Sequence, residues 1–187
     1  MNLVGAGADK TTLTVQSSDI VTVPNMYLFK QFNDNNSNVS ISLSMLKVSN
    51  YGFLTNNYGA IFYNAANALD VNFSIDQCIV ENITSNLGGI YYTNQATTSF
   101  TLTNTYLTDV LTLNHNNRFH STIYVGAGKV EINNCVFNNF TQDHNNLTQQ
   151  IKTKWGTILS GVQGKTATDA TELVFVNNTI ECRFSPH

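Results

Sequence analysis

Charged residues are scarce in this 187-residue sequence: only 11% are Asp, Glu, Lys or Arg, against roughly 25% in an average soluble protein. The nine Lys and Arg are scattered and the net charge is −3, so the basic stripe that nucleic-acid binding needs is missing. No apolar run approaches the roughly 20 residues that a membrane-spanning helix requires. We therefore expect no nucleic-acid partner and no membrane span in this chain.

Helix formers and tight-turn signals are also sparse. The chain has only two prolines and few Asn-Gly or Asp-Gly pairs, so a series of hairpins explains it poorly. Uncharged polar residues replace the missing charge, with 27 Asn, 23 Thr and 13 Ser. Alternating apolar runs such as 71–75 and 100–103 predict short β-strands. Only the segment from Gln142 to Trp155 is compatible with a short helix.

An apolar register recurs about every 30 residues. Each copy has an aliphatic residue, a buried residue three positions later, an apolar residue two further on, and then an amide or acid after two more. The copies begin at Leu43, Ile75, Leu102, Ile132 and Val176, with an earlier one expected near Leu13. Between them a block of two small residues, Ile and an apolar residue recurs at 59–62, 88–91, 121–124 and 156–159. A repeat of this length without a helix predicts a parallel β-solenoid.

In a solenoid, equivalent positions stack into ladders about 4.8 Å apart. About five to six coils fit into a single domain spanning 1–187, which we expect to be a segment of a larger protein. The position two beyond each aliphatic anchor reads Met45, Gln77, Asn104, Asn134 and Asn178. Asparagine tolerates the left-handed conformation of a tight corner, so the Asn excess acquires a structural cause.

The blocks Gly59-Ala60-Ile61 and Gly88-Gly89-Ile90, together with strands that end in asparagine, resemble the repeats of polymorphic outer-membrane proteins and other surface β-helix proteins. Over roughly residues 10–182 the sequence looks like a member of the pectate-lyase-like superfamily. The resemblance implies an all-β fold, a right-handed parallel β-helix, with an extracellular or cell-surface location.

The three cysteines do not form an obvious disulfide framework. Cys78 and Cys135 fall in one ladder with Thr105 between them, so they should lie two rises, roughly 10 Å, apart, beyond disulfide reach. We expect buried free thiols there, whereas Cys182 remains available to a partner outside this chain. No Cys/His spacing suggests zinc, and we expect no metal or other cofactor.

Seven Asn-x-Ser/Thr sequons are candidate N-glycosylation sites if the source is eukaryotic. They are Asn35, Asn38, Asn72, Asn82, Asn139, Asn146 and Asn177. Chance alone gives roughly five in a chain so rich in Asn, Ser and Thr, so the number is not enriched. The sequence leaves their glycosylation open.

Catalytic signals are weak. Hydrolysis of a glycoside needs two carboxylates about 5 to 9.5 Å apart, but Asp76, Asp109 and Glu131 fall in different ladder columns. The best constellation comprises Asp109, Arg118, His120, Asp143 and His144. A solvated loop explains these residues better than a catalytic role, so we expect no catalytic site and no enzyme.

Some surface features could bind a partner. Tyr91, Tyr92, Tyr124 and Trp155 could form a row that stacks on sugar rings, or they could alternate between core and surface. Loop insertions at about 140–155 and 161–171 interrupt the repeat and are candidates for partner contacts. Gly5-Ala6-Gly7 is expected to be a flexible start rather than a phosphate loop.

The preferred hypothesis is a non-enzymatic structural or adhesive β-helix, secreted or at the cell surface. Its expected partners are other protein subunits or surface glycans. Open solenoid ends expose unpaired strands, so subunits could assemble end to end. The alternative is a carbohydrate-active enzyme or carbohydrate-binding module on the same fold.

Overall fold

The computed structural model describes residues 1–14, 26–31, 39–52, 59–64, 71–85, 90–93, 99–113, 123–125, 128–143, 159–161 and 171–181. These segments contain strands and no helix, so the prediction of an all-β fold is confirmed. The strand pairs recorded within the sheets are all parallel, as a solenoid requires and a hairpin fold does not.

The strands form three stacked sheets, here called A, B and C. Sheet A contains β1 (Asn2–Val4), β4 (Val39–Ser44), β7 (Val71–Asp76), β10 (Ser99–Thr103), β13 (Gly128–Asn133) and β16 (Thr171–Val176). Sheet B contains β2 (Thr12–Thr14), β5 (Lys47–Gly52), β8 (Ile79–Ser85), β11 (Tyr106–Leu113), β14 (Val136–Asp143) and β17 (Thr179–Glu181). Sheet C contains β3 (Met26–Gln31), β6 (Gly59–Asn64), β9 (Tyr91–Thr93), β12 (Ile123–Val125) and β15 (Leu159–Gly161).

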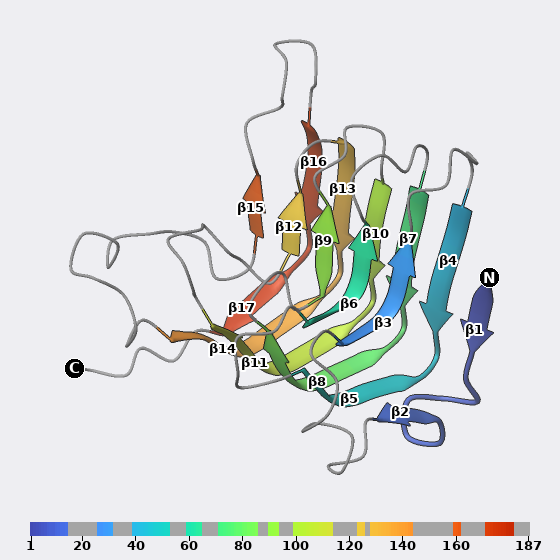
Figure 1. Cartoon of the computed structure of the whole chain (residues 1–187). Coiled ribbons are helices and arrows are strands. Elements are labelled where there is room, and N and C mark those ends of the chain that lie inside the picture. The colour runs from blue at the N-terminus through green and yellow to red at the C-terminus, as the bar shows by residue number, and fades with distance from the viewer. Residues whose placement is uncertain are drawn as a thin grey trace.

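Each sheet takes every third strand, so the chain visits A, B and C in a fixed order and then returns to A. In Figure 1 the sheets grow from blue strands at the N-terminal side to red strands at the C-terminal side, with sheet B running beneath the other two. We call three consecutive strands a repeat. This arrangement is compatible with a β-helix or solenoid, because neighbouring repeats, rather than neighbouring strands, pair.

Alternate side chains of sheet A build the core. Leu43 pairs in register with Ile75, Ile75 with Leu102, and Leu102 with Ile132. All four side chains are completely buried. In β7 the burial alternates strictly between the core and the outer face, which is the period of two that the sequence shows. Burial of each such side chain stabilises the fold by about 1.5–3 kcal/mol.

Aromatic rings form a second column between sheets A and C. The ring of Phe62 lies 4.5 Å from that of Phe73 and 5.3 Å from that of Phe29. Tyr91 contacts Phe73 edge to face at 5.6 Å and stacks on Phe100 at 4.6 Å. The rings therefore link four repeats through the middle of the core.

The structure corrects the register of the last repeat. Val176 was expected to continue the aliphatic ladder, but it pairs with Asn133 and is 42% exposed. Phe175 pairs with Ile132 and continues that ladder instead. The chain has apolar side chains at both positions, so the pattern alone does not separate the two registers, whereas alternation across the sheet permits only one of them to face the core.

The first repeat also begins earlier than expected. Leu3, rather than Leu13, pairs with Leu43, and Leu13 pairs with Val48 of the next sheet. Between them, the segment expected to be a flexible start is hydrogen-bonded to the second repeat: the Gly7 amide donates to the Met45 carbonyl at 2.9 Å. This turn makes the distance from Leu3 to Leu13 longer than that from Leu43 to Val48, so the first copy does not follow the spacing of the later ones.

Two further expectations shift in the structure. Ile123 was aligned with Ile90, but it pairs with Tyr91 and with Leu159. The insertion expected from about 140 starts later, because β14 continues to Asp143. Residues 144–158 and 162–170, which hold most of both insertions and most of the candidate short helix, lie outside the described residues.

Candidate functional site

Recurrent polar side chains gather at the corner between sheets A and B. This corner has a left-handed backbone at Met45 (φ 55°), Gln77 (φ 51°), Asn104 (φ 50°), Asn134 (φ 56°) and Asn177 (φ 55°). Such a conformation is uncommon for residues other than glycine, and asparagine accepts it best because its short side chain bonds locally. The predicted corner position is confirmed in four repeats. In the last one Asn177 takes the place expected of Asn178, as the corrected register requires.

Backbone hydrogen bonds carry the ladder around this corner. The Met45 amide donates to the Asp76 carbonyl at 3.2 Å, and the Gln77 amide donates to the Thr103 carbonyl at 3.2 Å. Asn104 continues the series to the next repeat at 3.1 Å. Each corner therefore contacts the strand end of the following repeat, and the repeats are fixed at one spacing.

Asp76 is the centre of the side-chain network at this corner. Its Oδ1 accepts hydrogen bonds from the Thr103 hydroxyl at 2.7 Å and the Asn104 amide at 2.8 Å. Its Oδ2 accepts one from the Gln77 amide at 3.1 Å. Burial alone would raise the pKa of Asp76, but these hydrogen bonds outweigh it and lower the pKa below its ordinary value. Asn134 extends the network by donating to Asn104 at 2.7 Å.

Replacing Asp76 with asparagine should flatten the acid side of the stability profile. A lowered native pKa means that the carboxylate stabilises the fold above its unfolded pKa of about 4 and loses that contribution as the pH falls through the native value. We expect the wild type to lose stability below about pH 4 and Asp76→Asn to lose less over the same range. The measurement is the midpoint of urea unfolding between pH 2 and 6. Glu131→Gln, on the outer face of β13 two strands away in sheet A, is the matched control, and identical pH profiles for wild type and Asp76→Asn would contradict the assignment.

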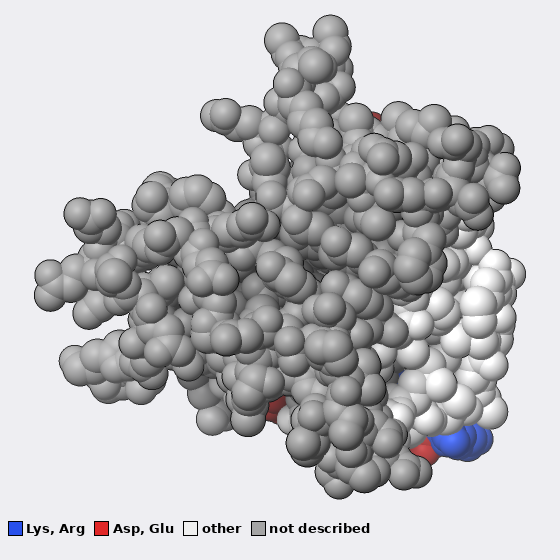
Figure 2. Space-filling view, in the orientation of Figure 1, with Lys and Arg blue, Asp and Glu red and all other residues white. Residues whose placement is uncertain are grey.

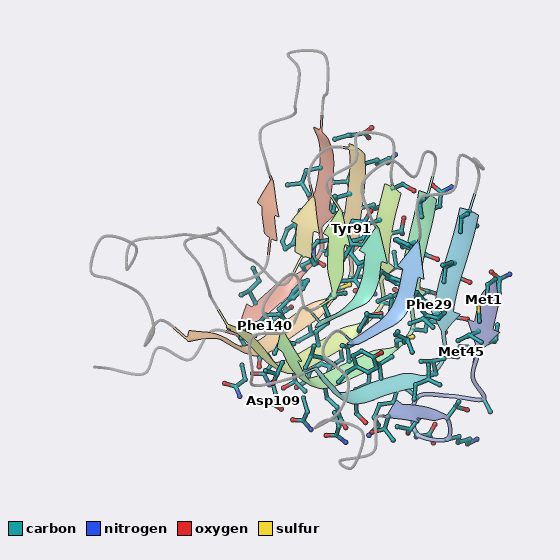
Figure 3. The ribbon with its side chains drawn as sticks, viewed as in Figure 1. Met1, Phe29, Met45, Tyr91, Asp109 and Phe140 are labelled. Carbon is teal, nitrogen blue, oxygen red and sulfur yellow. The ribbon has the colours of Figure 1, made fainter. Side chains whose placement is uncertain are left out.

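A second polar ladder bends the strands of sheet B. Its members, with left-handed φ angles of 53–55°, are Asn50, Asn82, Asp109 and Asn139. The Asn82 amide donates to the Asn50 carbonyl oxygen at 3.4 Å, and the Asn139 amide donates to Asp109. Sequence reasoning recognised a recurring amide or acid here but not the bend. Figure 3 places Asp109 along the lower side of the molecule, where sheet B runs.

The structure does not assemble the candidate catalytic constellation from its described members. Asp109 faces Asn139 and also accepts a hydrogen bond from the Thr108 hydroxyl at 3.1 Å. Asp143 pairs with Leu113, four residues further along the same two strands. The remaining members, Arg118, His120 and His144, lie outside the described residues.

Other carboxylates in the described part form ion pairs between repeats. Glu81 lies 3.2 Å from the ammonium of Lys47, and Glu172 lies 3.4 Å from that of Lys129. Figure 2 shows how few charged atoms appear on the described part of this face. Within the segments that the structure describes, no three His, Cys, Asp or Glu side chains are grouped so that they could hold a metal ion.

The described sequons fall into two structural classes. Asn72 is exposed on the outer face of β7, and its carbonyl oxygen accepts a hydrogen bond from the Ser99 hydroxyl. In contrast, the side-chain nitrogens of three sequon residues donate within the ladders, where a glycan on that nitrogen would replace a donor hydrogen. These residues are Asn82, Asn139 and Asn177. Asn35, Asn38 and Asn146 lie outside the described residues.

Cys78 and Cys135 are both buried and free. Thr105 lies between them in the ladder, because Tyr106 donates to the Cys78 carbonyl and Val136 donates to the Thr105 carbonyl. The Thr105 hydroxyl also accepts from the Cys78 amide at 3.3 Å. In the last repeat Asn178 takes this position, and its side-chain oxygen accepts from the Cys135 amide at 2.9 Å.

Both buried thiols should react slowly in the folded protein. Burial raises the pKa of Cys78 and of Cys135, which lowers the fraction of reactive thiolate, and the core also blocks access to the reagent. We expect labelling by iodoacetamide at pH 8 to be at least about tenfold slower than in urea-unfolded protein. Peptide mass spectrometry reports each cysteine separately, so Cys182 does not confuse the result. A Cys78–Cys135 disulfide, or equal rates in both states, would contradict this prediction.

Of the aromatic row considered as a sugar platform, Tyr91 belongs to the core. It is 1% exposed and stacks on Phe100, so it is not available to a ligand. Tyr92 and Tyr124 pair in register across β9 and β12, while Trp155 lies outside the described residues. Neighbouring residues point to opposite faces of a strand, which explains why a run of two tyrosines cannot all face outward.

The outer face of sheet A carries mainly small hydroxyl and amide side chains on β1, β4, β7 and β10. One column across this face reads Asn2, Ser42, Ser74, Thr101 and Glu131. Ser42 donates to the Asn2 side chain at 2.8 Å, so neighbouring strands are also joined on this side. From β1 to β10 this column offers hydroxyl and amide donors and acceptors at the strand spacing, and charged side chains enter at β13 and β16 with Glu131 and the Lys129–Glu172 pair.

The comparisons with known proteins leave the chain without an assigned family. The described residues contain no helix of the length and apolar character needed to cross a bilayer. No protein-family model matches the sequence, and neither a curated protein nor a solved structure matches it.

Proposed function

We propose that this chain is a non-enzymatic structural or adhesive domain, a right-handed parallel β-helix of five coils and a partial sixth, exposed at a cell surface or secreted. The observation that carries the proposal is the use of the carboxylates. Asp76 and Asp109 accept hydrogen bonds within the polar ladders, and Glu81 and Glu172 pair with lysines of adjacent repeats. Acidic groups engaged in this way stabilise the stack and are poorly placed to act as an acid and base.

The outer face of sheet A supports the adhesive part of this proposal. Its hydroxyl and amide groups could hydrogen-bond to surface glycans or to another protein without needing complementary charge. The same observation favours the second candidate, a carbohydrate-binding module on a pectate-lyase-like β-helix. The two candidates differ in specificity, since a module should select one polysaccharide.

A combined binding and turnover assay tests the proposal. Purified chain is mixed with polygalacturonate, xylan, cellulose and chitin, and both retention on the insoluble fraction and release of new reducing ends are measured. We expect no release above the protein-free blank. Retention that Thr101→Arg on the outer face reduces, and that Thr108→Arg on sheet B does not, supports the adhesive face. Catalysed release from any polymer would overturn the non-enzymatic assignment, and strong retention on only one polymer would favour the binding module.

A further inference from the structure

The C-terminal end of the sheet stack leaves core positions uncovered. Leu173, Phe175 and Ile180 are 51%, 37% and 48% exposed. Their partners in the preceding repeat, Val130, Ile132 and Phe137, are at most 1% exposed. These three side chains continue interior ladders, and among the described residues no strand pairs with the outer edge of β16 or β17, so apolar ladder positions are uncovered on this side of the described sheets.

The N-terminal end presents the other side of the same ladders. Leu3 of β1 and Leu13 of β2 are only partly buried, and they pack against the core through their partners Leu43 and Val48. Among the described segments, no strand pairs with the outer edge of β1 or β2. Met1 and Met45 mark this end in Figure 3.

The two ends match in register and direction. All strands of sheets A and B run parallel, so a second copy displaced along the stack would present β1 to β16 and β2 to β17 in the orientation that the sheets already use. Continuing both ladders by one rise of about 4.8 Å puts Phe175 against Leu3 of the second copy and Ile180 against its Leu13. A single displacement along the stack therefore places β1 and β2 of the second copy in register with β16 and β17 at the same time.

Charge disfavours contact between two C-terminal ends. Of the two acids on the last described strands, Glu172 pairs with Lys129, and Glu181 lies on β17. Two C-terminal ends would bring two Glu181 carboxylates into one contact, whereas the turn between β1 and β2 carries one residue of each charge, Asp9 and Lys10. A head-to-tail contact therefore avoids this repulsion between like charges.

We propose that the open C-terminal end binds the N-terminal end of a second copy of this chain, so that β16 and β17 pair with the partner's β1 and β2. The inference rests on the proposed structural function, of which it specifies the partner. A head-to-tail contact between unlike surfaces does not close on itself by translation, so it leads to linear oligomers that lengthen with concentration.

Sedimentation velocity of the full chain between about 1 and 200 µM tests the proposal. We expect the mass of the wild type to rise with concentration. Ile180→Lys and Leu13→Lys should each weaken self-association at least about tenfold, because each buries a charge in the contact. Thr179→Lys and Thr12→Lys add the same charge to the outer faces of the same strands and should have much smaller effects. Far-ultraviolet circular dichroism establishes that each variant is folded.

Mixing the two blocked variants separates the modes of contact. Ile180→Lys retains a normal N-terminal end and Leu13→Lys retains a normal C-terminal end, so an equimolar mixture should form a discrete dimer that neither variant forms alone. A wild type that stays monomeric at 200 µM, or a Leu13→Lys variant that dimerises alone through its C-terminal ends, would overturn the head-to-tail contact. Neither result would bear on the polysaccharide assay, so the proposed function can fail separately.

Discussion

Replacing Phe73 with alanine is expected to destabilise the fold by about 3–5 kcal/mol, the loss typical of removing a buried aromatic ring. Phe73 is 1% exposed, and its ring stacks on Phe62 at 4.5 Å and meets the edge of Tyr91 at 5.6 Å. The cavity cannot collapse easily, because the hydrogen-bonded ladders fix the spacing of the strands around it. The measurement is the midpoint of urea unfolding at an unchanged denaturant slope.

The neighbouring residue supplies the control for this substitution. Ser74→Ala changes the next side chain of the same strand, which points to the outer face, and should alter stability by no more than about 0.5 kcal/mol. Phe73→Leu retains part of the volume and should fall between the two. If Phe73→Ala lowers the free energy of unfolding by less than about 1.5 kcal/mol, the aromatic column does not contribute to the stability of the core as proposed.

The middle of the fold could be predicted from sequence because two periodicities agree there. Alternation within a strand assigns Leu43, Ile75, Leu102 and Ile132 to one face, and the repeat of about 30 residues brings them to one ladder. A polar residue at one of these positions would have broken both the alternation within the strand and the repeat, and would have left the register undetermined. Consistency between local and long-range patterns is therefore what made this part predictable.

The ends could not be predicted in the same way. At the C-terminal end, Phe175 and Val176 are both apolar and Asn177 and Asn178 are identical, so a shift of one residue changes the pattern little. Only pairing with Ile132 decides in favour of Phe175. At the N-terminal end, the long turn before β2 displaces the first copy beyond a fixed-period search.

The polar networks depend on contacts that no local pattern reveals. Asp76 receives its hydrogen bonds from Thr103 and Asn104 of the next repeat and from Gln77 of its own. The sequence shows that Asp76 directly precedes the corner residue Gln77. Which side chains of the next repeat reach its carboxylate depends on the length of the connection between the two repeats. For the same reason, the spacing of the acids in the sequence argues against a catalytic pair but does not reveal the hydrogen bonds that these acids accept.

Gly5→Ala is expected to detach the first strand from the stack, at a cost of about 1–3 kcal/mol for the resulting overlap. A Cβ atom at Gly5 would overlap the backbone carbonyl oxygen of Met45 and would lie 2.8 Å from the Cβ of Leu46 and 2.9 Å from that of Thr11. A backbone oxygen held in the ladder cannot move aside as a flexible side chain can. The turn must therefore shift, and its hydrogen bonds to the second repeat are lost.

Hydrogen exchange distinguishes this local opening from global unfolding. The amides of Gly7 and Lys47, which donate to Met45 and Thr11 across the two repeats, should exchange at least about tenfold faster in Gly5→Ala. Val4→Ala alters the adjacent, 67% exposed side chain and should leave both rates nearly unchanged. Unaltered protection in Gly5→Ala would mean that the turn accommodates a methyl group. Because β1 also forms the surface proposed to receive the next copy, a detached turn should weaken self-association together with this protection, whereas unfolding elsewhere would not couple the two.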